Sequence, residues 1–184
     1  MANQTQHGDH LDTESESESE SLRLWFHSVD TDHSNSINVD ELQVALEASN
    51  LRFPKTIVAQ MIRMYDADQN GSMSFEEFTS LHNFLNTVHF AFSNVARNQQ
   101  SISLNEVYMA LHQAGFSLDQ PSFLTTCQSF DPTRSGKFEV NDFISICIFL
   151  QSAKNLFTAF DTTKQGRISL DYNQFIYCAA NLRI

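Results

Sequence analysis

Five residues that offer oxygen atoms stand at positions 1, 3, 5, 7 and 12 of one twelve-residue segment. In order, they are Asp66, Asp68, Asn70, Ser72 and Glu77. The backbone carbonyl of Ser72 is the oxygen expected at position 7. A calcium ion takes about six to eight oxygen ligands, and a glutamate at position 12 closes such a cage with both carboxylate oxygens. Gly71, at position 6, permits the positive φ of a sharp turn. The segment therefore predicts a calcium-binding loop.

The same arrangement of oxygens occurs between residues 30 and 41. Its predicted ligands are Asp30, Asp32, Ser34, the backbone carbonyl of Ser36, and Glu41. Asn35 stands at position 6, where glycine is usual, and asparagine adopts the left-handed conformation at a lower cost than most residues. We therefore expect this loop to bind calcium as well, more weakly than residues 66–77.

A third candidate, residues 131–142, has the shape of such a loop but poorer ligands. Its candidate ligands are Asp131, Thr133, Ser135, Lys137 and Asp142. Thr133 and Ser135 are neutral, and Asp142 is shorter than a glutamate, so it is expected to give a single oxygen. We expect weak binding here, with magnesium as an alternative to calcium.

Two further segments keep the length of the loop without its ligands. Residues 95–106 carry Arg97 at position 3, and a single carboxylate that faces an arginine does not hold a dication. In residues 161–172, Tyr172 replaces the closing glutamate. We predict that neither segment binds calcium.

All five loops share an apolar residue at position 8. These residues are Ile37, Met73, Ile102, Phe138 and Ile168, at intervals of 36, 29, 36 and 30 residues. The repeat indicates helix–loop–helix units, or hands, that pair by joining their position-8 residues in short antiparallel β-bridges. If hand 1 pairs with hand 2 and hand 3 with hand 4, the fifth hand is left alone. Because an unpaired hand exposes apolar surface, we expect a homodimer or a heterodimer through hand 5.

Apolar residues at helical spacing flank the loops and predict an all-α fold. The apolar stripe runs without Gly or Pro from Phe78 to Val95, and again from Phe143 to Phe160. Hands 2 and 3 are therefore expected to share one helix, and hands 4 and 5 another. The predicted hands lie near residues 22–49, 55–91, 84–114, 121–153 and 150–182.

The first twenty residues differ from the remainder of the chain in composition. The alternating Ser and Glu of residues 13–20 offer no apolar side chain to bury, and their charges repel one another. We therefore predict a disordered acidic head over residues 1–20 and a single domain over residues 21–184.

Composition excludes several classes of function. The net charge of −11 disfavours nucleic acid as a partner, because phosphates would be repelled. No apolar run reaches the roughly eighteen residues of a membrane span, and no secretory leader is present, so we expect a cytoplasmic protein. No nucleophile–base pair, phosphate loop or open metal site stands out, so we do not expect an enzyme.

Five hands with helices shared between hands 2 and 3 and between hands 4 and 5 resemble the penta-EF-hand family. The resemblance covers residues from about 21 to 184. It implies Pro-rich or annexin-like partner segments and calcium-dependent peripheral contact with a membrane. Two features depart from the family: the head is rich in Ser and Glu instead of Gly and Pro, and hand 3 has lost its ligands.

The leading functional hypothesis is a calcium sensor. Calcium in the first two loops would draw Glu41 and Glu77, with the helices that carry them, toward the ion. An apolar cleft would then open to a partner peptide or a membrane surface. Two alternatives stay open: a calcium or magnesium buffer that barely opens, and a non-catalytic regulatory subunit of an enzyme.

Overall fold

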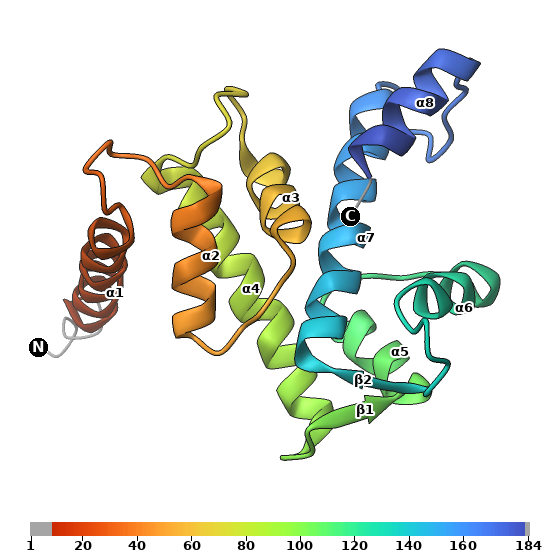
Figure 1. The fold of residues 1–184 in the computed structure, drawn as a ribbon, viewed down its shortest axis with the longest axis horizontal. Helices are drawn as coiled ribbons and strands as arrows, with labels where there is room; N and C mark the ends of the chain where they lie inside the picture. Colours follow the sequence, from red (N-terminus) through yellow and green to blue (C-terminus); the bar gives the residue numbers. More distant parts are fainter. Residues whose placement is uncertain (1–8, 183–184) are drawn as a thin grey trace, which may run out of the picture.

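The computed structural model describes residues 9–182, with side chains from residue 19 onward. These residues form eight helices and one two-stranded sheet (Figure 1). The helices are α1 (Asp9–Val29), α2 (Val39–Ala48), α3 (Lys55–Tyr65), α4 (Phe75–Ala96), α5 (Leu104–Gln113), α6 (Gln120–Ser129), α7 (Val140–Phe160) and α8 (Tyr172–Asn181). The strands are β1 (Ser101–Ser103) and β2 (Lys137–Glu139). The all-α prediction is confirmed.

The five hands follow one another along the chain as predicted. The pairs of helices α1–α2, α3–α4, α4–α5, α6–α7 and α7–α8 flank the five loops. Helix α4 runs unbroken for 22 residues and α7 for 21, so each is both the outgoing helix of one hand and the incoming helix of the next. The two shared helices inferred from the uninterrupted apolar stripes are therefore present.

Position-8 residues join the loops in two pairs. Ile37 and Met73 form an isolated antiparallel bridge, in which each backbone N–H donates to the other residue's carbonyl at 2.8 Å. Ile102 pairs with Phe138 at the centre of the β1–β2 sheet. All four side chains are at most 1% exposed. In contrast, Ile168 belongs to no strand or bridge and is only partly buried, so hand 5 lacks a partner within the described chain.

The two halves of the molecule meet where α7 lies beside α3 and α4 (Figure 1). Buried side chains of α7, such as Ile144 and Ile148, join the same core as Ile57 and Met61 of α3. Helix α8 lies at the far end of α7 and buries none of its residues. The core therefore holds hands 1 to 4 together and leaves hand 5 at the edge.

Helix α7 is long and apolar enough, by length and composition alone, to cross a membrane, since an 18-residue stretch of it has a mean hydropathy of 1.4. The prediction that no apolar run reaches that length is therefore wrong for residues 140–160. The helix packs on α3 and α4 and places Phe143, Ile144 and Cys147 in the core. Such burial accounts for the apolar composition of α7 as that of a central core helix.

The predicted disorder of residues 1–20 is wrong for residues 9–20, since α1 begins at Asp9. Two effects outweigh the repulsion between charges on which the prediction rested. Glutamate, which recurs in this segment, is a good helix former. The apolar stripe around Phe26 and Val29 fixes the downstream turns in the core, and helix then propagates upstream at little further cost. Residues 1–8 lie outside the described part of the chain.

Candidate metal centres

An aspartate at position 1 organises each of the first two loops. The two oxygens of Asp30 accept the N–H groups of Ser34 and Asn35, both at 2.9 Å. Asp66 accepts those of Asn70 and Gly71 in the same way, both at 3.0 Å. This cradle of two N–H groups turns the backbone around the carboxylate and fixes the start of the loop.

The turn places position 6 in the left-handed region in both loops. Gly71 has a φ of +81°, and Asn35 has a φ of +60°, as expected for an asparagine that replaces the usual glycine. Position 4 is left-handed as well, at His33 and Gln69. Sequence reasoning missed position 4: histidine is enriched in the left-handed region and could have signalled it at His33, whereas glutamine at Gln69 has no such preference.

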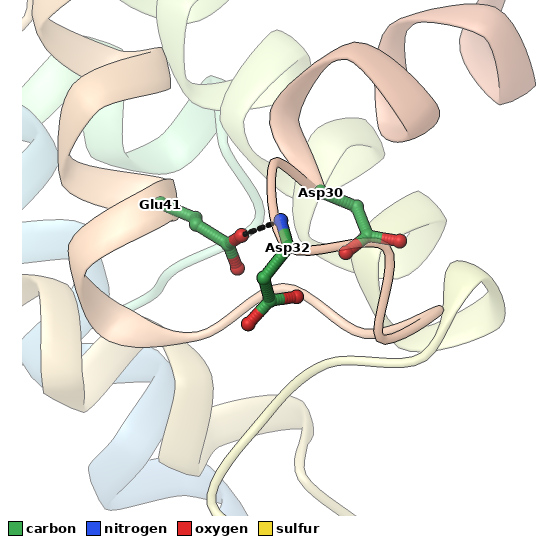
Figure 2. A group of neighbouring side chains, drawn as sticks. All are labelled: Asp30, Asp32 and Glu41. Carbon is green, nitrogen blue, oxygen red and sulfur yellow. Dashed lines mark hydrogen bonds between the residues drawn. The ribbon is translucent and has the colours of Figure 1, made fainter.

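Carboxylates from three points of the chain gather in each of these loops. In loop 1, Asp30, Asp32 and Glu41 place carboxylate oxygens within 4.8 Å of one another, and Figure 2 shows that these side chains come from the end of α1, the loop and α2. In loop 2, Asp66, Asp68 and Glu77 form the matching group. These are the only two such groups among the described residues. Three carboxylates this close repel one another, and a hard dication is the partner that they suit.

The closing glutamates tie the start of each loop to its outgoing helix. One oxygen of Glu41 accepts the N–H of Thr31 at 2.8 Å and that of Asp32 at 3.4 Å (dashed in Figure 2), and the other accepts the N–H of Asn38 at 3.1 Å. Glu77 bonds Ala67 and Ser74 in the same way, both at 2.9 Å. Each glutamate is thus part of the capping box that begins the outgoing helix. A shift of the glutamate toward an ion would move that helix.

Local hydrogen bonds favour the charged form of two acids of loop 1, Glu41 and Asp32. Burial acts to raise the pKa of Glu41, but hydrogen bonds from Asn38, Thr31 and Asp32 outweigh it and leave the pKa below its ordinary value. Hydrogen bonds from the side chain and backbone of Ser34 likewise lower the pKa of Asp32. Both acids are therefore ionised at neutral pH, as a calcium ligand must be.

The remaining predicted ligands lie in the same loops and are held by local hydrogen bonds. The hydroxyl of Ser34 donates to the carbonyl of Ser36 at 3.0 Å. The side-chain amide of Asn70 donates to Asp68 at 2.8 Å, while its oxygen accepts the N–H of Ser72, also at 2.8 Å. These bonds place the oxygens of both loops around the carboxylate groups; their role as ligands stays a prediction.

Loop 4 keeps the cradle but not the carboxylate group. Asp131 accepts the N–H groups of Ser135 and Gly136 at 2.9 and 2.7 Å, and the hydroxyls of Thr133 and Ser135 also donate to it, both at 3.2 Å. The carbonyl of Lys137 accepts the hydroxyl of Ser135 at 3.1 Å. Asp142 is used to cap α7 by accepting the N–H of Glu139 at 2.9 Å. Only Asp131 and Asp142 supply negative charge at candidate ligand positions, which agrees with a weak site.

Loop 3 begins differently from the other four. Its first position, Val95, still lies within α4, and the chain turns at Arg97 and Asn98, with φ values of +46° and +69°. Glu106 caps α5 by accepting the N–H and hydroxyl of Ser103, both at 2.7 Å. The closing glutamate therefore serves the helix here, without the other ligands of a calcium site.

Loop 5 is longer than its sequence pattern suggested. Asp161 has the usual cradle, formed by Gln165 and Gly166 at 3.0 and 2.7 Å. However, the capping box of α8 is formed by Asp171 and Gln174, and Asp171 is position 11 of the loop. In the other four loops, the capping box of the outgoing helix begins at position 9. Gln174, and not Tyr172, thus stands where the closing glutamate would be. The signal that would have revealed the shift was the capping pattern Asp-x-x-Gln at residues 171–174.

Comparison with known proteins places these loops among calcium-binding relatives. The family model of the EF-hand domain pair matches residues 19–81. Sorcin from Schistosoma japonicum is 34% identical over 162 residues, which are 86% of this chain and 94% of that protein. Peflin from Mus musculus is 34% identical over 161 residues, 85% of this chain but 58% of peflin. The chain therefore spans less than two thirds of the length of its peflin relative.

A solved structure shares the fold. It is described as a homolog of programmed cell death 6 protein from Leishmania major Friedlin. The two chains superimpose with a TM-score of 0.63 at 28% sequence identity, over 88% of this chain and 90% of the other. The similarity thus extends beyond the first pair of hands to nearly the whole described chain.

Proposed function

This chain belongs to the penta-EF-hand family of calcium-binding proteins, and from that premise we propose that it is a cytoplasmic calcium sensor driven by hands 1 and 2. Binding and not catalysis is the proposed role. The observation that carries the proposal is the pair of carboxylate groups in loops 30–41 and 66–77. Loop 4 is proposed as a weaker site for calcium or magnesium.

In loops 1 and 2, the closing glutamate links the metal site to the outgoing helix. Each closing glutamate is both a predicted ligand and the residue that caps the outgoing helix. Calcium that binds both oxygens of Glu41 and Glu77 competes with their backbone hydrogen bonds, so that α2 and α4 shift with the carboxylates. The bridge between Ile37 and Met73 keeps the two loops together while this happens.

An apolar cleft already adjoins the first loop. It lies between α1 and α2, has a volume of about 400 Å³, and has a mainly apolar lining surface, to which Trp25, Val29 and Val44 contribute. Thr31 and Glu41 line it too, and they are the residues that bond to each other across the loop. A movement of Glu41 therefore also moves part of the wall of the cleft. We propose that calcium widens this cleft for an apolar partner segment, Pro-rich or annexin-like, or for a membrane surface.

The proposed partner of hand 5 is a second penta-EF-hand chain. Helix α8 buries none of its residues and exposes Tyr172, Phe175, Ile176 and Tyr177, each by 45% or more. The backbone of Ile168 has no bridging partner in the described chain. A homodimer or a heterodimer that pairs two fifth hands would cover both features.

A matched pair of variants tests the dimer. Phe175→Glu and Leu24→Glu each place a charge on an exposed apolar side chain, 58% and 68% exposed respectively, on α8 and on α1. Sedimentation velocity is expected to show a dimer for the wild type and Leu24→Glu, and a monomer for Phe175→Glu. Wild-type protein that sediments as a dilute monomer, with and without calcium, would contradict the proposal.

The sensor itself is tested by titrating calcium in the presence of magnesium while a hydrophobic dye is followed. Glu41→Gln and Glu77→Gln are compared with Glu76→Gln, at an exposed acid of α4 that is not a predicted ligand, as the control. We expect a dye signal that rises with calcium at about micromolar concentrations, is weakened in both glutamine variants and is nearly unchanged in the control. Calcium uptake without a dye response would favour the buffer, and absence of uptake would contradict both.

A further inference from the structure

The C-terminus of α3 is capped by a side chain from the other half of the molecule. The last carbonyls of a helix have no partner within that helix. The carbonyl of Met64, in the last turn of α3, accepts a hydrogen bond from the side-chain amide of Asn155 at 3.1 Å. Asn155 lies on α7, 91 residues further along the chain, in the helix that hands 4 and 5 share. The end of one hand is therefore held by a residue of another pair.

The amide of Asn155 is itself held in place. Its oxygen accepts the side-chain amide of Gln151, one helical turn earlier on α7, at 2.8 Å. This bond occupies the oxygen and leaves the NH₂ group to face Met64. The orientation of Asn155 is thus set by its own helix before α3 is considered.

A second polar contact fixes α3 against α7 one turn away. The side-chain amide of Gln60 donates to the hydroxyl of Ser152 at 2.8 Å, and both residues are only 3% exposed. The guanidinium of Arg63 donates to the oxygen of Gln60. Because a buried polar group that loses its partner is costly, this contact sets the position of α3 along α7. The two contacts together hold the last two turns of α3.

Those turns lead directly into the second calcium loop. Asp66, the first predicted ligand, follows Met64 by two residues, and its N–H still bonds to the carbonyl of Ile62 within α3. A shift in the last turn of α3 therefore displaces the carboxylate of Asp66 relative to Asp68 and Glu77. Loop 1 has different support, since α1 packs on α2 and α4 and lies on the opposite side of them from α7 (Figure 1).

We propose that Asn155 is a positioning residue for the calcium loop of hand 2. By capping α3 from the helix of hands 4 and 5, it holds Asp66 in place and raises the calcium affinity of residues 66–77. Coupling of this kind is reciprocal, so calcium in loop 2 acts back on α7 and on hand 5 at its end. The inference rests on the proposed binding of calcium in loop 2.

The test measures calcium binding to loops 1 and 2 separately. Loop 2 is isolated in a Glu41→Gln background and loop 1 in a Glu77→Gln background, and each is titrated by calorimetry with and without Asn155→Leu. Leucine is similar in size to asparagine but has no amide to donate. Asn105→Leu, at an exposed asparagine of α5, is the matched control.

We expect Asn155→Leu to weaken binding in loop 2 by about 3- to 10-fold, the loss of one hydrogen bond, and to leave loop 1 and the control unchanged. Gln151→Leu, which frees the amide without removing it, is expected to weaken loop 2 by a smaller factor. That variant keeps the test decisive if Asn155→Leu fails to fold.

The outcomes separate this inference from the proposed function. No calcium binding by loop 2 in the Glu41→Gln background, with Asn155 intact, would overturn the proposed function and the inference together. Binding that is unaffected by both α7 variants would overturn the inference alone. Equal weakening of loops 1 and 2 would also overturn it, because it would indicate a general loss of stability.

Discussion

Hands 2 and 5 have the same loop framework and opposite surroundings. Asp66 and Asp161 each hold two backbone N–H groups, and position 6 is a left-handed glycine in both, at Gly71 and Gly166. Only hand 2 adds a group of carboxylates to this framework. The comparison shows that one aspartate and two left-handed residues suffice to shape the loop, whereas metal binding depends on what stands at the other ligand positions.

The two hands differ equally in burial. Position 8 of hand 2 is Met73, which is fully buried and bridged to Ile37, and its outgoing helix α4 places Phe78 and Leu81 in the core. Position 8 of hand 5 is Ile168, without a bridge, and α8 buries no residue. Pairing of loops therefore decides whether a hand contributes to the core or offers surface to a partner.

The largest expected effect tests this difference in burial by removing a position-8 side chain from a paired loop and from the unpaired loop. Ile37→Ala empties a fully buried site at the bridge and is expected to cost about 2–5 kcal/mol of unfolding free energy. Ile168→Ala, the same change in hand 5, is expected to cost less than about 1 kcal/mol in the monomer, because the side chain is only partly buried. Urea denaturation of monomeric protein measures both. Similar losses in the two variants would mean that hand 5 is as well packed as hand 1.

The next prediction sharpens the difference in ligands. If loop 5 is two residues longer, a glutamate at position 174 completes it better than one at position 172. Gln174→Glu is expected to raise calcium affinity at loop 5 by no more than about tenfold from a very weak starting value, since Lys164 and Arg167 oppose the ion. Tyr172→Glu is expected to give no gain. Calorimetry that finds the reverse order would contradict the shifted register of α8.

A smaller effect concerns position 6 of loop 1. Asn35 adopts a φ of +60°, which a glycine would adopt without strain. Asn35→Gly is therefore expected to strengthen calcium binding in loop 1 by a factor of about 2 to 5, within the roughly 1 kcal/mol cost of a left-handed residue. Gly71→Asn in loop 2 is the opposite change and should weaken binding by a similar factor. Titration of each loop in isolation tests the pair.

The smallest expected effect is a pH dependence of the stability of the protein that comes from one side chain on the outgoing helix of hand 2. The ring of His82 on α4 packs edge-on against that of Trp25, with 5.6 Å between the ring centroids. Burial lowers the pKa of His82 from the ordinary value of 6.5. The folded state therefore favours neutral His82, and its contribution to stability is present above pH 6.5 and is lost as the pH falls from there toward the lowered pKa. His82→Gln should reduce the fall in melting temperature between pH 7.5 and 5.5. An identical fall in the variant and the wild type would show that His82 does not contribute.

Much of the fold followed from local patterns. The unbroken apolar stripes predicted the shared helices α4 and α7, and the position-8 residues predicted the bridge at Ile37 and Met73 and the pairing of Ile102 with Phe138. The acidic members of loops 1 and 2 were predicted by spacing alone, because a calcium loop folds around ligands that are close in sequence.

Other features depend on information that the loop pattern does not contain. The helical conformation of residues 9–20 comes from propagation of a helix anchored at Phe26, which composition cannot show. The extension of loop 5 lay in a capping box that the twelve-residue template overlooked. The contact of Asn155 with Met64 joins residues 91 apart, and no periodicity in the sequence reveals such a pair.

The bridge between Ile37 and Met73 also has a consequence for the shape of the calcium response. Each residue's backbone supplies both a donor and an acceptor to the other, so neither loop orders without affecting its neighbour. The first ion restricts the motion of its own loop and, through the bridge, that of the neighbouring loop, so the second ion has less conformational entropy to remove. The two loops are therefore expected to fill cooperatively, with a Hill coefficient above one. Calcium occupancy of such a pair changes little over most of the range of calcium concentrations and rises steeply within a narrow part of it.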